Sequence, residues 1–303
     1  MKISVIICTY NRARYIYRLL GSIAEGDCPS SEYEIILVDN NCTDNTVEEV
    51  ARFQTDHPEV SLRLVKETAQ GLSHARNRGI SEACGDILVY VDDDATVNAG
   101  YLSAYISFFD SNPDTDAAGG PVIPAYEDGA EPEWMTYHLR RLLTGYLYFG
   151  DKEKEFPGDN YPGGGNAAYR RRVFETVGLY NVSLGRSGGN LAGGEEKDIF
   201  NKMRSAGMTF RYLPGPVLYH SIPHYKLEAD FFNRLTRGIG ESERMRTRAI
   251  SGKAYLARIA KEAVKWGGTV VLWCGYALRG RVRSGNMLVK FRANVTSGLL
   301  NLS

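Results

Sequence analysis

Three consecutive carboxylates follow a short apolar stretch of the chain. The stretch Ile87–Val91 is followed directly by Asp92, Asp93 and Asp94. Adjacent carboxylates repel one another, so such a group is costly unless a cation lies among them. Hard divalent cations prefer oxygen ligands and often also hold substrate phosphates. The triplet therefore predicts a site for Mn²⁺ or Mg²⁺, although a solvated turn rich in Asp would have the same composition.

Further polar groups follow other apolar stretches. Thr9, Tyr10 and Arg12 follow the first stretch, and Asp39 ends the second. A later set comprises Gly163–Asn166, Gly194–Glu196 and His220. Ligands of open parallel sheets bind at the carboxyl ends of strands, so we expect the first group to gather there with the acidic triplet. Each residue also has a structural explanation, such as capping by Asp39 or a helix N-terminus at the glutamates.

The first hundred residues alternate between strand and helix patterns. Strands are predicted at Lys2–Cys8, Glu34–Val38, Leu62–Val65 and Ile87–Val91, and helices at Ala13–Glu25, Thr43–Gln54 and Leu72–Ala83. This alternation predicts an α/β fold: a Rossmann-like, mostly parallel sheet with helices on both faces. Its strands would present the polar groups above at one edge of the sheet.

Beyond residue 100 the pattern is weaker. Helices are expected at Tyr101–Asp110, Arg170–Val177 and Glu196–Ala206, and strands at Ala117–Ile123, Phe210–Leu213 and Val217–Tyr219. From Leu227 to about Ala277 the chain is predicted to be mostly helical. The segment Asp151–Gly165 is polar and rich in Gly and Pro, which predicts a mobile loop that becomes ordered over a bound ligand.

The formal net charge of zero hides an uneven distribution. From Arg234 onward there are 14 Lys or Arg and three Glu, a net charge of +11, and the rest of the chain carries −11. A basic tail on an acidic body predicts an anionic partner surface. No nucleic-acid recognition motif accompanies this charge, so we expect lipid headgroups and no nucleic acid.

The same tail contains a short apolar run, Val270–Leu278, between basic residues. It is far shorter than the ~20 residues that span a bilayer. The pattern predicts a helix in the membrane interface, or else a helix packed on the catalytic domain with a solvated basic face.

Length and composition suit a globular chain with one large domain and an appendage. The 303 residues are 43% hydrophobic and 24% charged, and the five cysteines show no C-x-x-C spacing. Reduced thiols are therefore expected, with neither a disulfide framework nor a zinc site. Since the chain opens on a strand pattern, we expect no signal peptide and a cytoplasmic protein, attached peripherally to the cytoplasmic face of a membrane through its tail. The sequence makes no prediction of oligomeric state.

Seven motifs together resemble the family 2 glycosyltransferases, which have the A-type glycosyltransferase fold. They are CTYNR, VDNNCTDNT, GLSHARNRGI, VYVDDDA, PGGGNAAYRRRVFETVG, GGEEKD and VLYH, and they extend from residue 3 to about 250. The resemblance implies an inverting enzyme that moves a sugar from a nucleotide sugar, in the first place a UDP-sugar, to a hydroxyl of a glycan or lipid-linked acceptor. The Gln-x-x-Arg-Trp motif of processive relatives is absent, so one sugar per encounter is expected.

The resemblance also implies a domain division and residue roles. The catalytic domain would be 1–226, with a nucleotide-binding half, 1–100, and an acceptor half, 101–226, before a helical basic extension, 227–303. Nucleotide binding is implied for Thr9, Tyr10, Arg12, Asp39, Arg76, Asn77, Asp92 and Asp93. Metal binding is implied for Asp92, Asp94 and His220, and contact with the donor sugar or acceptor for Gly164, Gly165 and Asn166. Glu196 would be the general base; because the family's Glu-Asp pair is Glu-Glu here, Glu195 stays an alternative.

Two other classes of function stay open at this point. A nucleotidyltransferase of the same fold type also uses strand-end acids, but its usual Gly-rich, basic signature is missing from Thr9–Arg12. A non-catalytic glycan-binding scaffold is disfavoured because the acid pair and the base are both present. Within the favoured class, a small molecule or a protein is an alternative acceptor.

Overall fold

The computed structural model describes residues 2–186 and 194–302, which form two compact units. The first unit comprises Met1–Ala125 and Gly145–Ser221, and the second comprises Tyr126–Thr144 and Ile222–Ser303.

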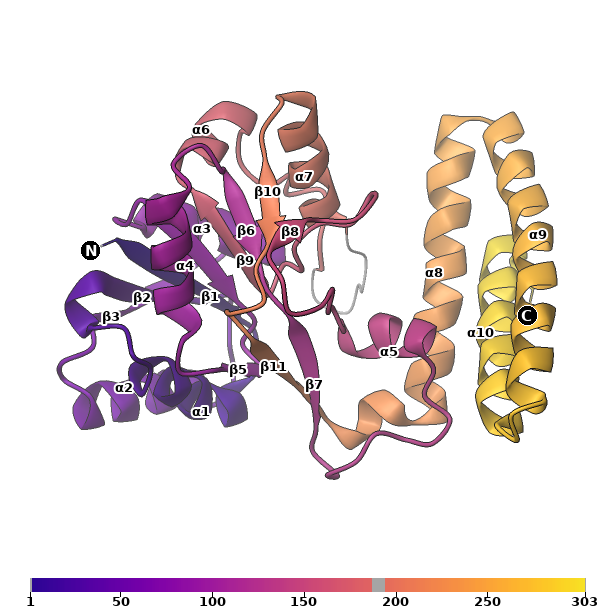
Figure 1. Ribbon diagram of the computed structural model, residues 1–303, viewed down its shortest axis with the longest axis horizontal. Helices are drawn as coiled ribbons and strands as arrows, with labels where there is room; N and C mark the ends of the chain where they lie inside the picture. Colours follow the sequence, from indigo (N-terminus) through magenta and orange to yellow (C-terminus); the bar gives the residue numbers. More distant parts are fainter. Residues whose placement is uncertain (1, 187–193, 303) are drawn as a thin grey trace. The chain divides into compact units, whose positions relative to one another are not determined.

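An eight-stranded sheet with the order β3-β2-β1-β4-β9-β6-β10-β8 forms the centre of the first unit (Figure 1). Its strands are β1 Ile3–Thr9, β2 Tyr33–Asp39, β3 Leu62–Lys66, β4 Ile87–Val91, β6 Ala117–Gly119, β8 Lys154–Glu155, β9 Asn166–Arg170 and β10 Phe210–Tyr212. β1 pairs in parallel with β2 and β4, and β2 with β3. A smaller sheet has the order β5-β11-β7, formed by Ala95–Val97, Leu218–Ile222 and Val122–Tyr126.

Helices cover both faces of the large sheet. They are α1 Ala13–Ala24, α2 Thr46–Asp56, α3 Leu72–Glu82, α4 Tyr101–Ser111, α6 Arg172–Val177 and α7 Glu195–Ser205. Successive side chains of a strand point to opposite faces, so a strand buried on both sides is apolar throughout. In β1, Val5 and Ile7 belong to one buried cluster with α1, α2 and α4, whereas Ile6 belongs to another with α3, α6 and α7. The predicted α/β fold is confirmed.

One central strand, β9, was not predicted from the sequence. It runs antiparallel between β4 and β6, with Ala168 opposite Val89 on one side and Ala118 on the other. Its sequence, NAAYR, lacks β-branched residues, which are the usual mark of a strand. Pairing with neighbours on both sides therefore decides its conformation, and that information is not local.

The segment 151–165 is not the unanchored loop that its composition predicts. Phe156 is buried, with its ring 5.9 Å from that of Tyr212, and Tyr161 stacks on Phe200 at 5.3 Å. Strand β8, which lies in this segment, pairs with β10. The expectation that the whole segment becomes ordered on ligand binding does not fit these contacts.

The second unit is helical. It contains α5 Tyr137–Thr144, α8 Ala229–Ile250, α9 Gly252–Ala277 and α10 Val282–Leu300. The backbones of α8 and α10 approach each other closely at Gly240. A Cβ added there would lie 2.1 Å from the Val295 carbonyl oxygen. Among the described residues, no helix is both long and apolar enough to cross a bilayer.

This unit differs from the extension expected to begin at residue 227. It also takes in residues 126–144, because Leu139 and Leu143 of α5 join Phe232 and Leu288 in one apolar cluster. These residues lie about 90 to 150 positions apart, so their packing leaves no periodic signal in the sequence. α10 likewise extends the helical region beyond residue 277.

Candidate active site

Strand register gathers the first group of predicted residues at one edge of the sheet. Thr9 at the end of β1 is paired with Asp39 at the end of β2, and β4, on the other side of β1, leads into Asp92. Tyr10 follows β1 and is 44% exposed, so its ring is available to a ligand. The side chain of Asp39 is buried, and its Oδ1 accepts a hydrogen bond of 2.7 Å from the Cys42 amide.

Three asparagines, to which the sequence analysis gave no individual role, connect the loops after β1 and β2. Asn11 and Asn41 have φ of 55° and 67°, a left-handed conformation that Asn tolerates better than most residues. The Asn11 side chain accepts a hydrogen bond from the Thr43 amide at 2.7 Å. The buried Asn40 accepts one from the Gly71 amide at 2.8 Å, which connects the loop after β2 to the start of α3. Repeated Asn at strand ends was the signal available in the sequence.

The small sheet brings His220 next to the acidic triplet. β11 pairs antiparallel with β5, and His220 lies opposite Ala95, the residue after Asp94. His220 Nε2 is 3.2 Å from Asp94 Oδ1, and Arg12 Nη2 is 3.9 Å from Asp94 Oδ2. Two residues 126 positions apart are thus adjacent, as expected for shared ligands.

The donor atoms of Asp94 and His220 suit a divalent cation. Two neighbouring ligands of an octahedral ion at ~2.1 Å lie about 3 Å apart, close to the separation found here. Among the described residues, no three His, Cys, Asp or Glu side chains surround one point as metal ligands. A site with few protein ligands is typical of Mg²⁺ held together with substrate phosphates.

The electrostatics of the triplet also favour a cation. Although part of Asp92 is accessible to solvent, the surrounding protein raises the pKa of this side chain, and so does the negative charge of Asp94. Burial raises the pKa of Asp93 to about 7, and Asp94 adds to the effect. A divalent cation beside these acids would relieve their repulsion.

Arg76 orients the two candidate bases. Its Nη1 donates to Glu195 Oε1 and its Nη2 to Glu196 Oε1, both at 2.9 Å, from α3 to the first turn of α7. Burial alone would lower the pKa of Arg76, but the two glutamates raise it well above its ordinary value, so the guanidinium stays charged. Arg76 therefore holds both glutamates, a role that the sequence analysis did not assign to it.

Burial distinguishes the two glutamates. The side chain of Glu195 is 4% exposed and that of Glu196 is 30% exposed. A general base must reach the proton that it accepts from the substrate. Of the two, Glu196 has the accessible carboxylate.

The glycine turn lies against acids from both parts of the site. A Cβ at Gly164 would lie 1.7 Å from Glu196 Oε1, and a Cβ at Gly165 would lie 2.0 Å from Asp92 Oδ2. Neither position tolerates a side chain without displacement of a carboxylate. The backbone of two adjacent residues therefore lies close to both Asp92 and Glu196.

We expect Gly164→Ala to lower kcat sharply while the protein stays folded, because the new methyl group must displace Glu196. Gly163→Ala is the matched control, since the closest atom to its Cβ would be Val122 Cγ2 at an ordinary 3.7 Å. Steady-state kinetics and thermal unfolding of both variants test this. Equal kcat in the two variants would mean that the turn does not constrain the base.

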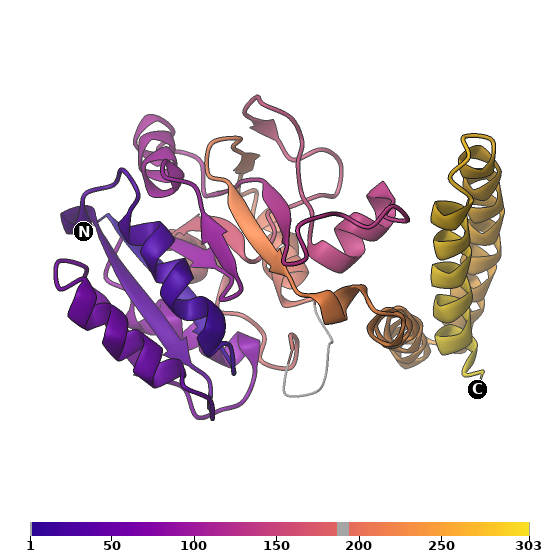
Figure 2. The same ribbon diagram turned by 90° about the horizontal axis from the view of Figure 1, so that it is seen from below.

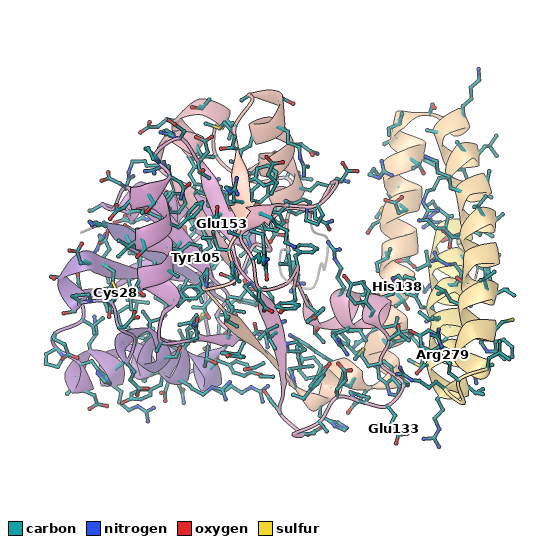
Figure 3. The ribbon with its side chains drawn as sticks, viewed as in Figure 1. Cys28, Tyr105, Glu133, His138, Glu153 and Arg279 are labelled. Atoms are coloured by element: carbon teal, nitrogen blue, oxygen red, sulfur yellow. The ribbon has the colours of Figure 1, made fainter. Side chains whose placement is uncertain are left out.

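The side-chain amides of two predicted site residues, Asn166 and Asn77, form hydrogen bonds within the protein. Asn166 is fully buried: its Oδ1 accepts hydrogen bonds from the Tyr101 and Tyr105 hydroxyls, and its Nδ2 donates to the carbonyls of Pro121 and Pro216. Tyr105, labelled in Figure 3, lies in α4. All four hydrogen-bonding positions of this amide are occupied, so Asn166 holds the turn in place and has none left for a sugar.

Asn77 likewise points to the backbone. Its Nδ2 donates to the Tyr180 carbonyl and its Oδ1 accepts from the Tyr180 amide, both at 2.9 Å. This pair of hydrogen bonds fixes the segment that follows α6. The structure thus gives Asn77 a structural role next to Arg76, which pairs with the two glutamates.

The sheet order, the strand-end acids and the paired glutamates at the start of α7 fit an α/β transferase of the A-type glycosyltransferase class. The chain belongs to glycosyl transferase family 2, whose sequence model matches residues 4–178. It is a glycosyltransferase.

Relatives support this assignment over most of the chain. A glucosyl-dolichyl phosphate glucuronosyltransferase of Haloferax volcanii is 27% identical over 237 residues, 76% of this chain and 72% of the relative. The succinoglycan biosynthesis protein ExoM of Rhizobium meliloti is 26% identical and covers 100% of this chain and 94% of its own length.

Solved structures share the fold. A mannosyltransferase of Pyrobaculum calidifontis, in complex with GDP-Man and Mn²⁺, has a TM-score of 0.59 at 20% identity and covers 100% of this chain and 88% of its own. The S. aureus TarS 1-349 structure in complex with UDP has a TM-score of 0.54 at 20% identity. That match covers 79% of this chain and 65% of the TarS chain.

Proposed function

We propose that the protein is an inverting, metal-dependent glycosyltransferase that uses a nucleotide sugar, in the first place a UDP-sugar. One observation carries the proposal. The Asp94–His220 pair, 3.2 Å apart, and the Arg76-oriented carboxylate of Glu196 belong to the same site, and the turn at Gly164–Gly165 contacts both Asp92 and Glu196. A leaving-group site and a base next to one another are what direct displacement at a sugar carbon requires.

The donor would bind along the strand ends. Tyr10 and Asp39 would contact the base of the nucleotide, and Asp92 and Asp93 the ribose. Asp94 and His220 would hold the divalent cation, whose charge stabilises the departing nucleoside diphosphate. Solved neighbours of the same fold contain UDP, or GDP-Man with Mn²⁺, which supports a nucleotide sugar and a divalent metal.

The acceptor hydroxyl would react from the side of Glu196. Its oxygen forms a bond to the anomeric carbon as the bond from that carbon to the diphosphate oxygen breaks. Glu196 takes the hydroxyl proton, and the nucleoside diphosphate leaves with the bonding electrons. Attack opposite the leaving group inverts the anomeric centre. Arg76 keeps the base in position and does not touch the reacting atoms.

A lipid-linked or polysaccharide-precursor glycan is the proposed acceptor. One relative is named for transfer to glucosyl-dolichyl phosphate, and another for succinoglycan biosynthesis. Such acceptors are found at membranes, and the basic C-terminal helices would keep the enzyme at the cytoplasmic face of one.

A screen of UDP- and GDP-sugars for release of nucleoside diphosphate tests the proposal. We expect release with one or a few UDP-sugars in Mn²⁺ or Mg²⁺ and loss of release in EDTA. Recovery after EDTA when metal is added back is the control for inactivation. Release that is unaffected by EDTA would contradict the metal requirement, and the absence of binding of any nucleotide sugar would contradict the proposal itself.

A further inference from the structure

The outward face of α9 is apolar over most of its length. Leu256, Val264 and Val271 of α9 are 66%, 77% and 72% exposed, and Leu278, directly after the helix, is 90% exposed. The smaller residues Ala260, Gly267 and Cys274 continue the same face. These positions follow one another at intervals of three or four residues, the spacing that places side chains on one side of a helix. From residue 256 to 278 the face is about 33 Å long.

The inward face of the same helix is charged. Arg258 and Glu262 are buried and pair at 2.7 Å, and Arg292 of α10 pairs with Glu262 at 2.8 Å. Burial alone would raise the pKa of Glu262, but Arg292 and Arg258 lower it, so the carboxylate stays ionised. A helix with charges inside and large apolar side chains outside inverts the arrangement that water favours. The outward face of α9 is therefore suited to an apolar surrounding.

The charges exposed around this face have one sign. Lys253, Lys261 and Lys265 of α9 are exposed, as is Arg279, which follows the helix and is labelled in Figure 3. Glu262, the sole acid of α9, is buried among arginines. Basic residues beside an apolar face complement anionic lipid headgroups.

A groove lies beside the apolar face, between α9 and α10, which are side by side in Figures 1 and 2. It has a volume of about 470 Å³ and is lined by Trp266, Val270, Trp273, Asn286, Val289 and Lys290. The indole nitrogens of Trp266 and Trp273 donate to Thr296 and Asn286 at 2.9 Å, so the rings are fixed. Such a groove suits a hydrocarbon chain with an anionic head near Lys290.

We infer that the outward face of α9 inserts into the interface of an anionic bilayer and that the adjacent groove takes up one lipid hydrocarbon chain. The inference deepens the proposed membrane location and rests on it. It narrows the sequence-based expectation that the net charge of the tail and the run Val270–Leu278 would mediate binding: Arg258 and Arg292 pair with the buried Glu262, and the proposed contact face begins near Leu256.

Co-sedimentation of the full-length protein with phosphatidylcholine vesicles, with and without phosphatidylglycerol, tests the inference. We expect binding to the anionic vesicles, and a loss on the order of tenfold or more in Val264→Asp/Val271→Asp, because two apolar side chains no longer leave water. Val47→Asp in α2 is the matched control, since Val47 is also exposed, at 46%. Circular dichroism and metal-dependent donor hydrolysis should be unchanged in both variants.

Insertion depth is measured at Cys274. In a Cys84→Ser background, which removes the other exposed thiol, a fluorophore on Cys274 should be quenched by brominated lipids in anionic vesicles. Binding that is equal in the double variant and the wild type would overturn the α9 face and leave membrane association standing. No vesicle binding by the wild type, with donor hydrolysis intact, would overturn both membrane claims but not the transferase. A dimer that the double variant disrupts, without quenching, would assign the face to a second copy and overturn the inference.

Discussion

Asp94→Ala is expected to reduce sugar transfer by at least ~10²-fold and to remove the metal-dependent part of nucleotide binding. Asp94 Oδ1 lies 3.2 Å from His220 Nε2, so its loss leaves the histidine alone to hold the cation. With one protein ligand remaining, the charge on the departing diphosphate is poorly stabilised. Calorimetry of UDP with and without Mn²⁺, together with a transfer assay, measures both effects.

Asp110→Ala is the control for the loss of one carboxylate. Asp110 is an exposed residue whose carboxylate pairs with Lys2 at 3.0 Å, and we expect both UDP binding and transfer to be unchanged in this variant. If UDP binds the wild type without metal, and Asp94→Ala binds it equally well, then Asp94 is not a metal ligand and the proposed leaving-group site is wrong.

Glu196→Gln should keep donor binding but lower kcat by roughly 10²-fold or more, the typical effect of losing a general base. Glutamine preserves the shape and the hydrogen bond from Arg76 but cannot accept the acceptor's proton. Glu195→Gln should be milder, because that side chain is 4% exposed and cannot reach a substrate as readily. Steady-state kinetics with both substrates, and the acid limb of the pH–kcat profile, separate binding from catalysis.

The control for this pair is Glu175→Gln, an exposed glutamate in the first turn of α6, as Glu196 is in the first turn of α7. It should have wild-type kinetics. A larger loss in Glu195→Gln than in Glu196→Gln would identify Glu195 as the base. The accessible carboxylate would then serve the donor or the acceptor instead.

The sequence by itself determined the elements whose signals are local. β1, β2 and β4 are mostly apolar because both faces of the sheet are covered, and polar residues lie at the end of each strand or directly after it. α1, α3 and α4 begin at the predicted residues, and each ends within one residue of its predicted end. The ordered motifs also pointed to the family, since the seven motifs occur together in the family's order. Class of fold, class of enzyme and the acidic triplet therefore followed from the sequence.

Tertiary structure alone decided what depends on residues far apart in the chain. Arg76 lies 119 residues before Glu195, and only the tertiary structure shows that its guanidinium pairs with both glutamates at the start of α7. The sequence predicted that Asn166 contacts a substrate, but in the structure its side-chain amide forms four hydrogen bonds with buried protein groups. The composition of α9 likewise does not show that some of its charged side chains are buried and that large apolar side chains are exposed. Periodicity records which residues share a face, whereas the partner of that face is set by contacts that the local sequence does not encode.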